Sequence, residues 1–276
     1  KITHKQKGLY NKMEKWKTQV LPPDEANIRL AAELLNQGEV VGFPTETVYG
    51  LAANAFDPQA VAKIFAAKGR PQDNPLIVHL CDPAQAKDVA SEVPEEFYSL
   101  ARAFMPGALT VVLPKSDKIP DVVTAGGNTV AVRIPDNVYA RELIARSFPL
   151  AAPSANRSKH VSPTTARHVY DDLAGRVELI LDDGECGVGI ESTVLDLTSD
   201  TPAILRPGAV TAEMLAPYLG VTPGSGKVLK VAKSPGMKYE HYAPEAQAYA
   251  ATDAEAAIRL YDSLKESGAH PVLLFT

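Results

Sequence analysis

Segments of helical periodicity and short apolar runs alternate along most of the chain. Apolar side chains recur every three or four residues between Asp24, an N-cap residue, and Gly38, and this spacing predicts a helix. A second helix begins at Asp57, with Pro58 in its first position, and ends at Gly69. Further helices are predicted at residues 83–90, 94–104, 138–147, 162–175 and 212–219. Short apolar runs predict strands at residues 39–43, 76–80, 109–113, 129–134, 150–152, 177–181, 193–197 and 203–205.

Strands that interleave with helices over residues 21–220 predict one α/β domain with a mixed sheet. Residues 1–20 form a basic arm, for which we expect no fixed structure, and Met13 is a candidate native start. Residues 221–244 are rich in glycine and proline and are interpreted as a linker. Residues 245–276 predict the start of a second α/β domain that is cut short, with a strand at 247–250, a helix at 254–267 and a strand at 271–275.

Composition narrows the class of protein. The 276 residues are 45% hydrophobic and 22% charged, which is typical of a globular protein and excludes disordered and fibrous classes. No apolar run reaches the roughly 18 residues of a membrane-spanning helix, so we expect a cytoplasmic protein without membrane contact. Two cysteines exclude a disulfide scaffold and a four-cysteine zinc site. The net charge of −5 disfavours a protein that coats nucleic acid duplexes.

Several familiar motifs are absent from the sequence. No Gly-x-Gly-x-x-Gly follows a predicted strand, so we expect no dinucleotide cofactor. Gly224 to Lys227 resembles a phosphate loop only superficially, because Val228 stands where serine or threonine is needed. The six histidines show no metal-binding spacing, so we expect no zinc.

In the first half of the chain, two polar clusters lie next to predicted elements. Residues 44–50 (PTETVYG) follow a strand, and their two threonines, glutamate and tyrosine either bind a small polar ligand or form a plain turn. Lys68 and Arg70 lie at a helix exit, before Asn74. A cation at a helix C-terminus is commonly only a partner of the helix dipole, but a stiff Gly-Arg-Pro loop also suits phosphate recognition.

In the second half, small hydroxyl residues and two arginines stand out. Ser154, Asn156 and Ser162 follow a strand and either form a phosphate cradle or, for Ser162, cap a helix. Ser192 and Arg206 lie beside other strand ends. Arg133 is a charge inside an apolar strand and needs a partner anion.

Taken together and in this order, these motifs resemble those of the YrdC-like threonylcarbamoyl-AMP synthases. The matching segments are PTETVYGL at 44–51, KGRP at 68–71, NPLIVH at 74–79, APSAN at 152–156, STV at 192–194 and RPG at 206–208. Residues 234–244 (SPGMKYEHYAP) resemble the linker of the longer, two-domain members. The resemblance implies a YrdC-type α/β fold, with a twisted mixed sheet around a concave active-site cavity and the start of a small Rossmann-like C-terminal domain.

The resemblance also implies a reaction. L-Threonine, bicarbonate or CO2, and ATP with Mg²⁺ would give L-threonylcarbamoyl-adenylate and pyrophosphate. A separate threonylcarbamoyl transferase complex would pass the product to tRNA, so tRNA would be only an indirect partner. A carbamate that attacks the α-phosphate needs positioning, charge neutralisation and exclusion of water rather than a covalent nucleophile.

Residue roles follow from the same resemblance. The catalytic candidates are Lys68, Arg70, Ser154 and Asn156. The ATP-binding candidates are Lys68, Arg70, Asn74, Thr129, Ser154, Ser162, Arg206, His241 and Tyr242, and the threonine-binding candidates are Thr47, His79, Arg133, Ala152 and Ser192. No protein ligand for a metal is identified, and Mg²⁺ is expected to arrive with ATP.

Two other functions remain open at this point. The first is a non-catalytic module that binds double-stranded RNA or the ribosome, against which the acidic composition counts. The second is the carbamoyl-adenylate chemistry of hydrogenase maturation proteins, whose related domain lies within a much longer chain. The linker itself is either a lid or a tether.

Overall fold

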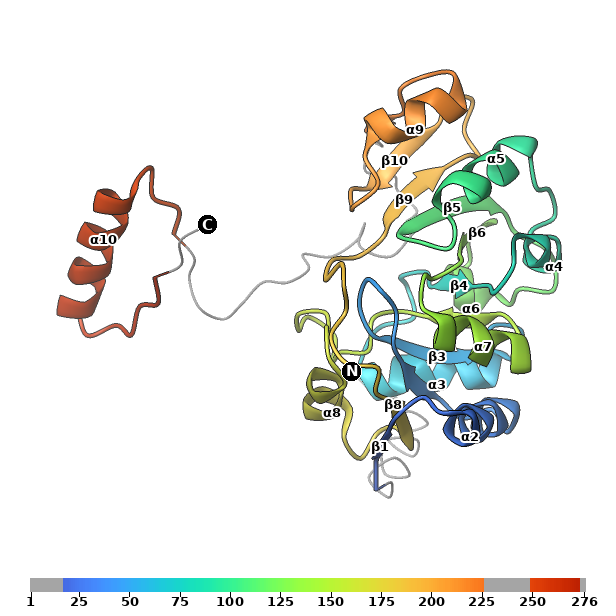
Figure 1. Ribbon diagram of the computed structural model, residues 1–276, viewed down its shortest axis with the longest axis horizontal. Coiled ribbons are helices and arrows are strands. Elements are labelled where there is room, and N and C mark those ends of the chain that lie inside the picture. The colour runs from blue at the N-terminus through green and yellow to red at the C-terminus, as the bar shows by residue number, and fades with distance from the viewer. Residues whose placement is uncertain (1–16, 226–248, 274–276) are drawn as a thin grey trace. The chain divides into compact units, whose positions relative to one another are not determined.

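The computed structural model describes residues 17–225 and 249–273 (Figure 1). The chain divides into two compact units, Lys1–Tyr242 and Ala243–Thr276. The first unit carries a large mixed sheet with helices on it, and the second carries one described helix. Residues 1–16 of the predicted arm at 1–20 lie outside the described residues, and so do His241 and Tyr242 of the linker.

The sheet orders its strands as β1-β8-β2-β3-β7-β4-β6-β5-β9-β10-β11. The strands are β1 (Gln19–Leu21), β2 (Val41–Phe43), β3 (Gly50–Asn54), β4 (Ile77–His79), β5 (Leu109–Pro114), β6 (Thr129–Arg133), β7 (Leu150–Ala152), β8 (Leu179–Leu181), β9 (Thr193–Asp196), β10 (Ala203–Arg206) and β11 (Gly224–Ser225). Parallel neighbours include β4 with β6 and β5 with β9, whereas β5 with β6 and β7 with β4 are antiparallel. The predicted α/β class with a mixed sheet is confirmed.

Most helices of the first unit begin and end close to the predicted positions. The helices are α2 (Glu25–Asn36), α3 (Pro58–Lys68), α4 (Ala86–Val89) after a 3₁₀ turn at Pro83–Gln85, α5 (Glu95–Phe104), α6 (Asp121–Thr124), α7 (Val138–Arg146), α8 (Ala166–Leu173) and α9 (Ala212–Leu219). Of these, α6 has no counterpart among the predicted helices, and α8 begins later than predicted. Asp24 and Asp57 each accept a hydrogen bond from a backbone N–H of the first turn, as N-caps do. Gly69 ends α3 with a φ of +63°, a left-handed conformation that glycine adopts easily.

The two faces of the sheet are covered differently. One face carries a large core, to which α3, α5, α8 and other helices contribute. On the other face, α2 and α7 lie side by side over the β8, β2, β3 and β7 end of the sheet (Figure 1). Farther along that face, Ile77, Val112, Ala131 and Val194 form a small cluster made of strand residues alone. Because no helix of residues 17–225 joins this cluster, that part of the face is available to polar side chains and loops.

The structure differs from the local predictions at three places. The helix predicted from Ser162 begins four residues later, and Thr165 rather than Ser162 is its N-cap. Strand β3 is absent from the predicted strands, because its sequence, GLAAN, lacks the β-branched residues that mark strands. Strand β1 begins inside the segment that we assigned to the basic arm.

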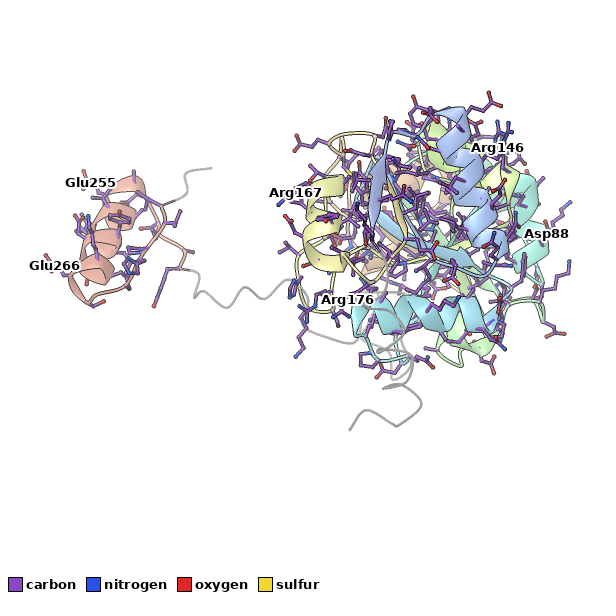
Figure 2. The ribbon with its side chains drawn as sticks, turned by 90° about the horizontal axis from the view of Figure 1, so that it is seen from below. Asp88, Arg146, Arg167, Arg176, Glu255 and Glu266 are labelled. Carbon is purple, nitrogen blue, oxygen red and sulfur yellow. The ribbon has the colours of Figure 1, made fainter. Side chains whose placement is uncertain are left out.

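The second unit contains α10 (Ala254–Glu266), which the sequence predicts, with Asp253 as its N-cap. Figure 2 shows Glu255 and Glu266 at its two ends. Residues 249–250 and 271–273, parts of the two strands predicted around this helix, are not in strands. The other residues of both predicted strands lie outside the described range.

Candidate active site

Strand register brings the predicted threonine-binding residues together. His79 on β4 is the direct neighbour of Arg133 on β6, and Arg133 is in turn opposite Thr110 on β5. Residues in register point to the same side of a sheet, so these three side chains share one face. It is the face that bears the small strand-only cluster of Ile77, Val112, Ala131 and Val194. The site therefore begins where the cover of α2 and α7 ends.

Arg133 is the centre of this arrangement and is only 4% exposed. Its Nε donates to the Gly107 carbonyl at 3.1 Å, and its Nη1 donates to Thr47 Oγ1 at 2.7 Å. Its Nη2 lies 2.6 Å from Glu46 Oε1. This last contact is an ion pair whose geometry is not that of a hydrogen bond, and neither of its two atoms has a hydrogen-bond partner. The anion that a buried arginine requires is thus Glu46, a residue outside the predicted site.

The hydroxyls of Thr45 and Thr47 fix the loop that carries Glu46. Thr45 Oγ1 donates to the carbonyl of Val48 at 2.7 Å. Because this bond uses the single hydroxyl proton of Thr45, the 2.9 Å contact between the two hydroxyls is a hydrogen bond that Thr47 donates to Thr45. Thr47 then accepts from Arg133, and one lone pair of its oxygen is left. Thr47 can therefore bind a further group only as an acceptor.

His79 is neutral in this site. Burial, and after it the positive charge of Arg133, lowers the pKa of His79 to about 3. The edge of Phe43 contacts the ring, with centroids 5.8 Å apart. Nδ1 is buried and has no hydrogen-bond partner. A buried ring nitrogen without a partner is costly, and this one can recognise a polar group of a ligand.

Lys68 is buried at the C-terminal end of α3. Its ammonium donates to the carbonyl of Ser154, to the carbonyl of Asn156 at 2.6 Å and to Asn156 Oδ1 at 3.3 Å. Burial, followed by the charge of Arg70, holds the pKa of Lys68 well below its usual value. The Asn156 amide also donates to two carbonyls of the same loop, those of Arg157 and His160. Lys68 and Asn156 together therefore hold the loop after β7 in shape.

Two further hydrogen bonds hold the C-terminal end of α3. Ser158 N–H donates to the Lys68 carbonyl at 2.9 Å. Arg176, beyond the end of α8, donates to the carbonyl of Ala67 at 3.2 Å and lies on the lower side of the first unit in Figure 2. Such a cation satisfies a carbonyl that the helix leaves unpaired at its C-terminus.

Arg70 and Asn74 form a second group just beyond α3. Arg70 Nη2 donates to the Asn74 carbonyl at 3.2 Å, and its guanidinium lies 5.9 Å from the centre of the Phe65 ring. The Asn74 side chain is 1% exposed, and neither its oxygen nor its nitrogen has a hydrogen-bond partner. A buried amide that can donate and accept is suited to a ligand with both kinds of group.

Ser192 links β9 to Arg206 on β10. Arg206 donates through Nε and Nη2 to the Ser192 carbonyl, at 3.0 and 2.9 Å, and through Nη2 to Ser192 Oγ at 3.1 Å. Ser192 Oγ contacts Thr110 Oγ1 at 2.7 Å. Thr110 is opposite Arg133 in the sheet, so this chain of contacts from Arg206 ends at the strand position next to Arg133.

Ser162 is bound to Glu191 rather than to a helix N-terminus. Its hydroxyl donates to Glu191 Oε1 at 2.5 Å. The segment that leads to Glu191 is itself tied to the 44–50 loop, because Val188 N–H donates to the Glu46 carbonyl at 2.8 Å and Tyr49 OH donates to the Gly184 carbonyl at 2.7 Å. The glycine-rich segment at residues 184–191 thus connects the 44–50 cluster with Ser162.

Thr129 and Ala152 lie on the same face as Arg133 but nearer the other end of their strands. Thr129 is four residues before Arg133 on β6, which corresponds to about 13 Å of extended chain. Ala152 is in register with Ile77 on β4. Thr129 and Arg133 therefore lie toward opposite ends of this face. The predicted site residues do not include Glu46 or Thr110, although Glu46 lies in the 44–50 cluster that the sequence singles out as a possible ligand-binding loop.

Other features of the described residues bear on ligands. No cluster of three His, Cys, Asp or Glu side chains comes together there that could hold a metal ion. Within the same residues, no helix is long and apolar enough to span a membrane. A pocket of about 390 Å³ lies apart from the predicted site residues, and its lining includes Asp24, Glu25 and Glu142. Arg146 also lines this pocket but pairs with Glu142, so the lining keeps a net negative charge that would repel a nucleotide's phosphates.

Comparison with known proteins now defines the class. Residues 33–208 match the Sua5/YciO/YrdC family, whose description is telomere recombination, and residues 210–276 match the family of threonylcarbamoyl-AMP synthase C-terminal domains. The chain belongs to the Sua5/YciO/YrdC family. Over 229 residues it is 52% identical to a threonylcarbamoyl-AMP synthase of Pyrococcus abyssi, covering 81% of this chain and 67% of that protein.

A second relative and a solved structure support the same class. A threonylcarbamoyl-AMP synthase of Bacillus subtilis is 50% identical over 234 residues, which are 83% of this chain and 68% of that protein. The crystal structure of P. abyssi Sua5 complexed with L-threonine superimposes with a TM-score of 0.86 at 46% identity, over 91% of this chain and 78% of that one. The chain thus spans about two thirds of the length of these curated synthases.

Proposed function

We propose that this chain is an L-threonylcarbamoyl-AMP synthase. It joins L-threonine, bicarbonate or CO2, and ATP to form L-threonylcarbamoyl-adenylate and pyrophosphate. The observation that carries this proposal is the buried Arg133, with Thr47 and a neutral His79 beside it, in a fold that superimposes on a relative complexed with L-threonine. A cation and two neutral polar groups suit the carboxylate and hydroxyl of that amino acid.

The amino-acid side of the site is assigned to β4, β6 and the 44–50 loop. Arg133 binds the threonine carboxylate, for which a planar guanidinium is well suited. Thr47 accepts a hydrogen bond, and His79 Nδ1 and Ser192 Oγ lie on the same face of the sheet. These groups recognise the side-chain hydroxyl, while Ala152 leaves room for the substrate.

The nucleotide side is assigned to the loops around Arg70 and Arg206. These two arginines neutralise the phosphates of ATP, whose Mg²⁺ enters as part of the substrate. Asn74, Thr129, Ser154 and Ser162 form hydrogen bonds to the nucleotide. Lys68 and Asn156 act through the loop after β7, which their hydrogen bonds hold in place. His241 and Tyr242 remain predicted ATP contacts outside the described residues.

The chemistry follows from this division. The threonine nitrogen attacks the carbonyl carbon of bicarbonate, and hydroxide combines with a proton from nitrogen to leave as water. A carbamate oxygen then attacks the α-phosphorus, and the bond to pyrophosphate breaks. Both steps require two bound ligands to meet in one site from which water is excluded, because carbamates decompose readily.

Partners and location follow from the reaction. An unstable mixed anhydride must be consumed quickly, so we propose that a separate transferase receives it and modifies tRNA in the cytoplasm. The chain itself would contact tRNA only indirectly. Its net charge of −5 agrees with this division of labour.

A panel of amino acids tests the proposed function. The full chain is incubated with Mg-ATP, ¹³C-bicarbonate and one amino acid at a time, and the adenylates are identified by mass spectrometry. We expect product with threonine, weak product with serine and at least roughly 10⁴-fold less with 2-aminobutyrate, since a site that binds a hydroxyl leaves groups unpaired without it. Equal turnover of threonine and 2-aminobutyrate would contradict the assignment. RNA binding without any adenylate product would favour the non-catalytic alternative.

A further inference from the structure

Glu46 is a buried carboxylate to which the proposed function gives no role. Its side chain is 14% exposed, and Oε1 lies 2.6 Å from Arg133 Nη2. Both carboxylate oxygens are nevertheless buried without a hydrogen-bond partner. A buried carboxylate normally receives several hydrogen bonds, because its desolvation is otherwise costly. Its unused capacity points to a ligand that donates hydrogen bonds.

Arg133 has unused capacity at the same point. Its Nε–H and one Nη1–H are taken by the Gly107 carbonyl and by Thr47. Nη2 contacts Glu46 but makes no hydrogen bond. A donor and an acceptor of opposite charge are therefore adjacent, and both are incompletely satisfied. This is unlike a closed structural ion pair, in which the hydrogen bonds of both partners are made.

The backbone on both sides of Glu46 is held in place. The Glu46 carbonyl accepts from Val188 N–H at 2.8 Å, and the next residue, Thr47, is bound to Thr45 and Arg133. The carboxylate is thus presented by a fixed loop rather than by a mobile one. A fixed charge costs little reorganisation when a ligand arrives.

The charges match a zwitterion. Arg133 and Glu46 supply one positive and one negative charge, and His79 adds none because burial lowers its pKa to about 3. A free α-amino acid at neutral pH carries one carboxylate and one ammonium group on the same carbon. Binding such a molecule beside the pair keeps the buried site neutral overall, whereas a molecule with only the carboxylate adds an uncompensated negative charge.

We propose that Glu46 binds the ammonium group of the amino-acid substrate while Arg133 binds its carboxylate. The proposal rests on the proposed function, since it assigns one more group of the same substrate. Glu46 then determines specificity for α-amino acids over the corresponding hydroxy acids.

A comparison of two ligands in three proteins tests this assignment. L-Threonine and 2,3-dihydroxybutyrate, which has a hydroxyl in place of the ammonium, are titrated calorimetrically into the full wild-type chain, Glu46→Gln and Glu39→Gln. Glu39 forms a half-buried ion pair with Lys63 at 2.7 Å and is the matched control. We expect the wild type and the control to prefer threonine by at least about 100-fold, as for a buried charge left without its partner. In Glu46→Gln the ratio should fall below about tenfold.

A variant that keeps the charge completes the test. Glu46→Asp shortens the carboxylate but retains it, and its ligand ratio should lie between those of the wild type and Glu46→Gln. An unchanged ratio in Glu46→Gln overturns the assignment, because a purely structural Glu46 would weaken both ligands alike. If the variants do not fold, a wild-type ratio near one overturns it equally. Failure of the wild type to bind threonine overturns the proposed function as well, so the two failures are distinguishable.

Discussion

Arg70 is the residue at which a structural role and a nucleotide-binding role separate most clearly. It follows the left-handed Gly69, rests near the Phe65 ring and donates to the Asn74 carbonyl. A cation that only stabilises a helix C-terminus contributes about 0.3–1 kcal/mol. An arginine that neutralises the phosphates of ATP should contribute much more than this to binding and turnover.

Arg70→Ala should therefore reduce adenylate formation far more than it reduces stability. We expect a loss of about 2–4 kcal/mol in transition-state stabilisation, typical of removing one preorganised charged donor. Arg70→Lys should restore only part of it, because an ammonium lacks the planar fork. Turnover and melting temperature are measured together, with Arg102→Ala, an exposed arginine of α5, as control. Near-normal turnover in Arg70→Ala would leave this residue a helix-end cation.

His79 predicts a pH dependence of stability. Its pKa is about 3 in the folded chain, whereas an unfolded histidine titrates near 6.5. Between these values the unfolded state binds the extra proton, so stability falls as the pH drops below 6.5 and is unaffected above it. The slope for one group is about 1.4 kcal/mol per pH unit.

His79→Gln should remove this component. Between pH 6.5 and 5 the variant should lose up to about 2 kcal/mol less stability than the wild type. Urea denaturation at several pH values measures the difference, and His168→Gln, on the exposed side of α8, should follow the wild-type curve. Parallel curves for wild type and His79→Gln would show that His79 does not carry this dependence.

At the scale of elements, α3 and the loop after β7 behave as one unit through Lys68. Lys68→Met keeps the length of the side chain and leaves three oxygens of Ser154 and Asn156 without their donor. Each buried acceptor left unpaired costs about 1–3 kcal/mol, so we expect a lower melting temperature and faster amide exchange at residues 153–160. Lys63→Met, in the same helix but in a half-exposed ion pair, should cost under about 1 kcal/mol. Equal exchange in the two variants would contradict the role of Lys68.

Gly208, the glycine of the Arg-Pro-Gly segment, packs closely against the backbone at the start of β9. A Cβ on Gly208 would lie 2.5 Å from the Thr193 nitrogen and 2.6 Å from the Glu191 carbonyl oxygen. Both are backbone atoms, so Gly208→Ala must displace the segment that carries Ser192. We expect a raised KM for threonine and ATP. Gly187→Ala, with nothing within 4 Å of the added Cβ, should be neutral. Unchanged kinetics in Gly208→Ala would show that the segment yields without affecting the site.

Elements with strong local signals could be predicted from sequence, and long-range contacts could not. Asp24, Asp57 and Gly69 punctuate α2 and α3 through bonds within a few residues. Ser162 looks like a cap by the same rules, yet its hydroxyl binds Glu191, 29 residues away. Glu46 as partner of Arg133 depends on how β2 and β6 are placed in the sheet, which no local pattern encodes. The family motifs identified the site residues, but register in the sheet explains which of them meet.

At the scale of the whole molecule, the chain combines one unit that carries the sheet with a second, smaller unit. The boundary between the two units falls within residues 234–244, which lie outside the described residues. Their two tyrosines and histidine make a lid the hypothesis to test against a tether. Deleting them should raise ATP hydrolysis relative to adenylate formation while the first unit stays folded. Phosphate release and product yield are measured in parallel, and circular dichroism reports the fold. Unchanged yield and ATP affinity would reduce the segment to a tether.

The central claim is that one site joins threonine, bicarbonate and ATP, and pyrophosphate exchange tests it most directly. Labelled pyrophosphate is added to the full chain with Mg-ATP, and label in ATP is counted with and without each of the other two substrates. If the α-phosphate is attacked by threonine carbamate, label enters ATP only when threonine and bicarbonate are both present. Exchange that does not depend on threonine, or no exchange with all substrates present, would contradict the account.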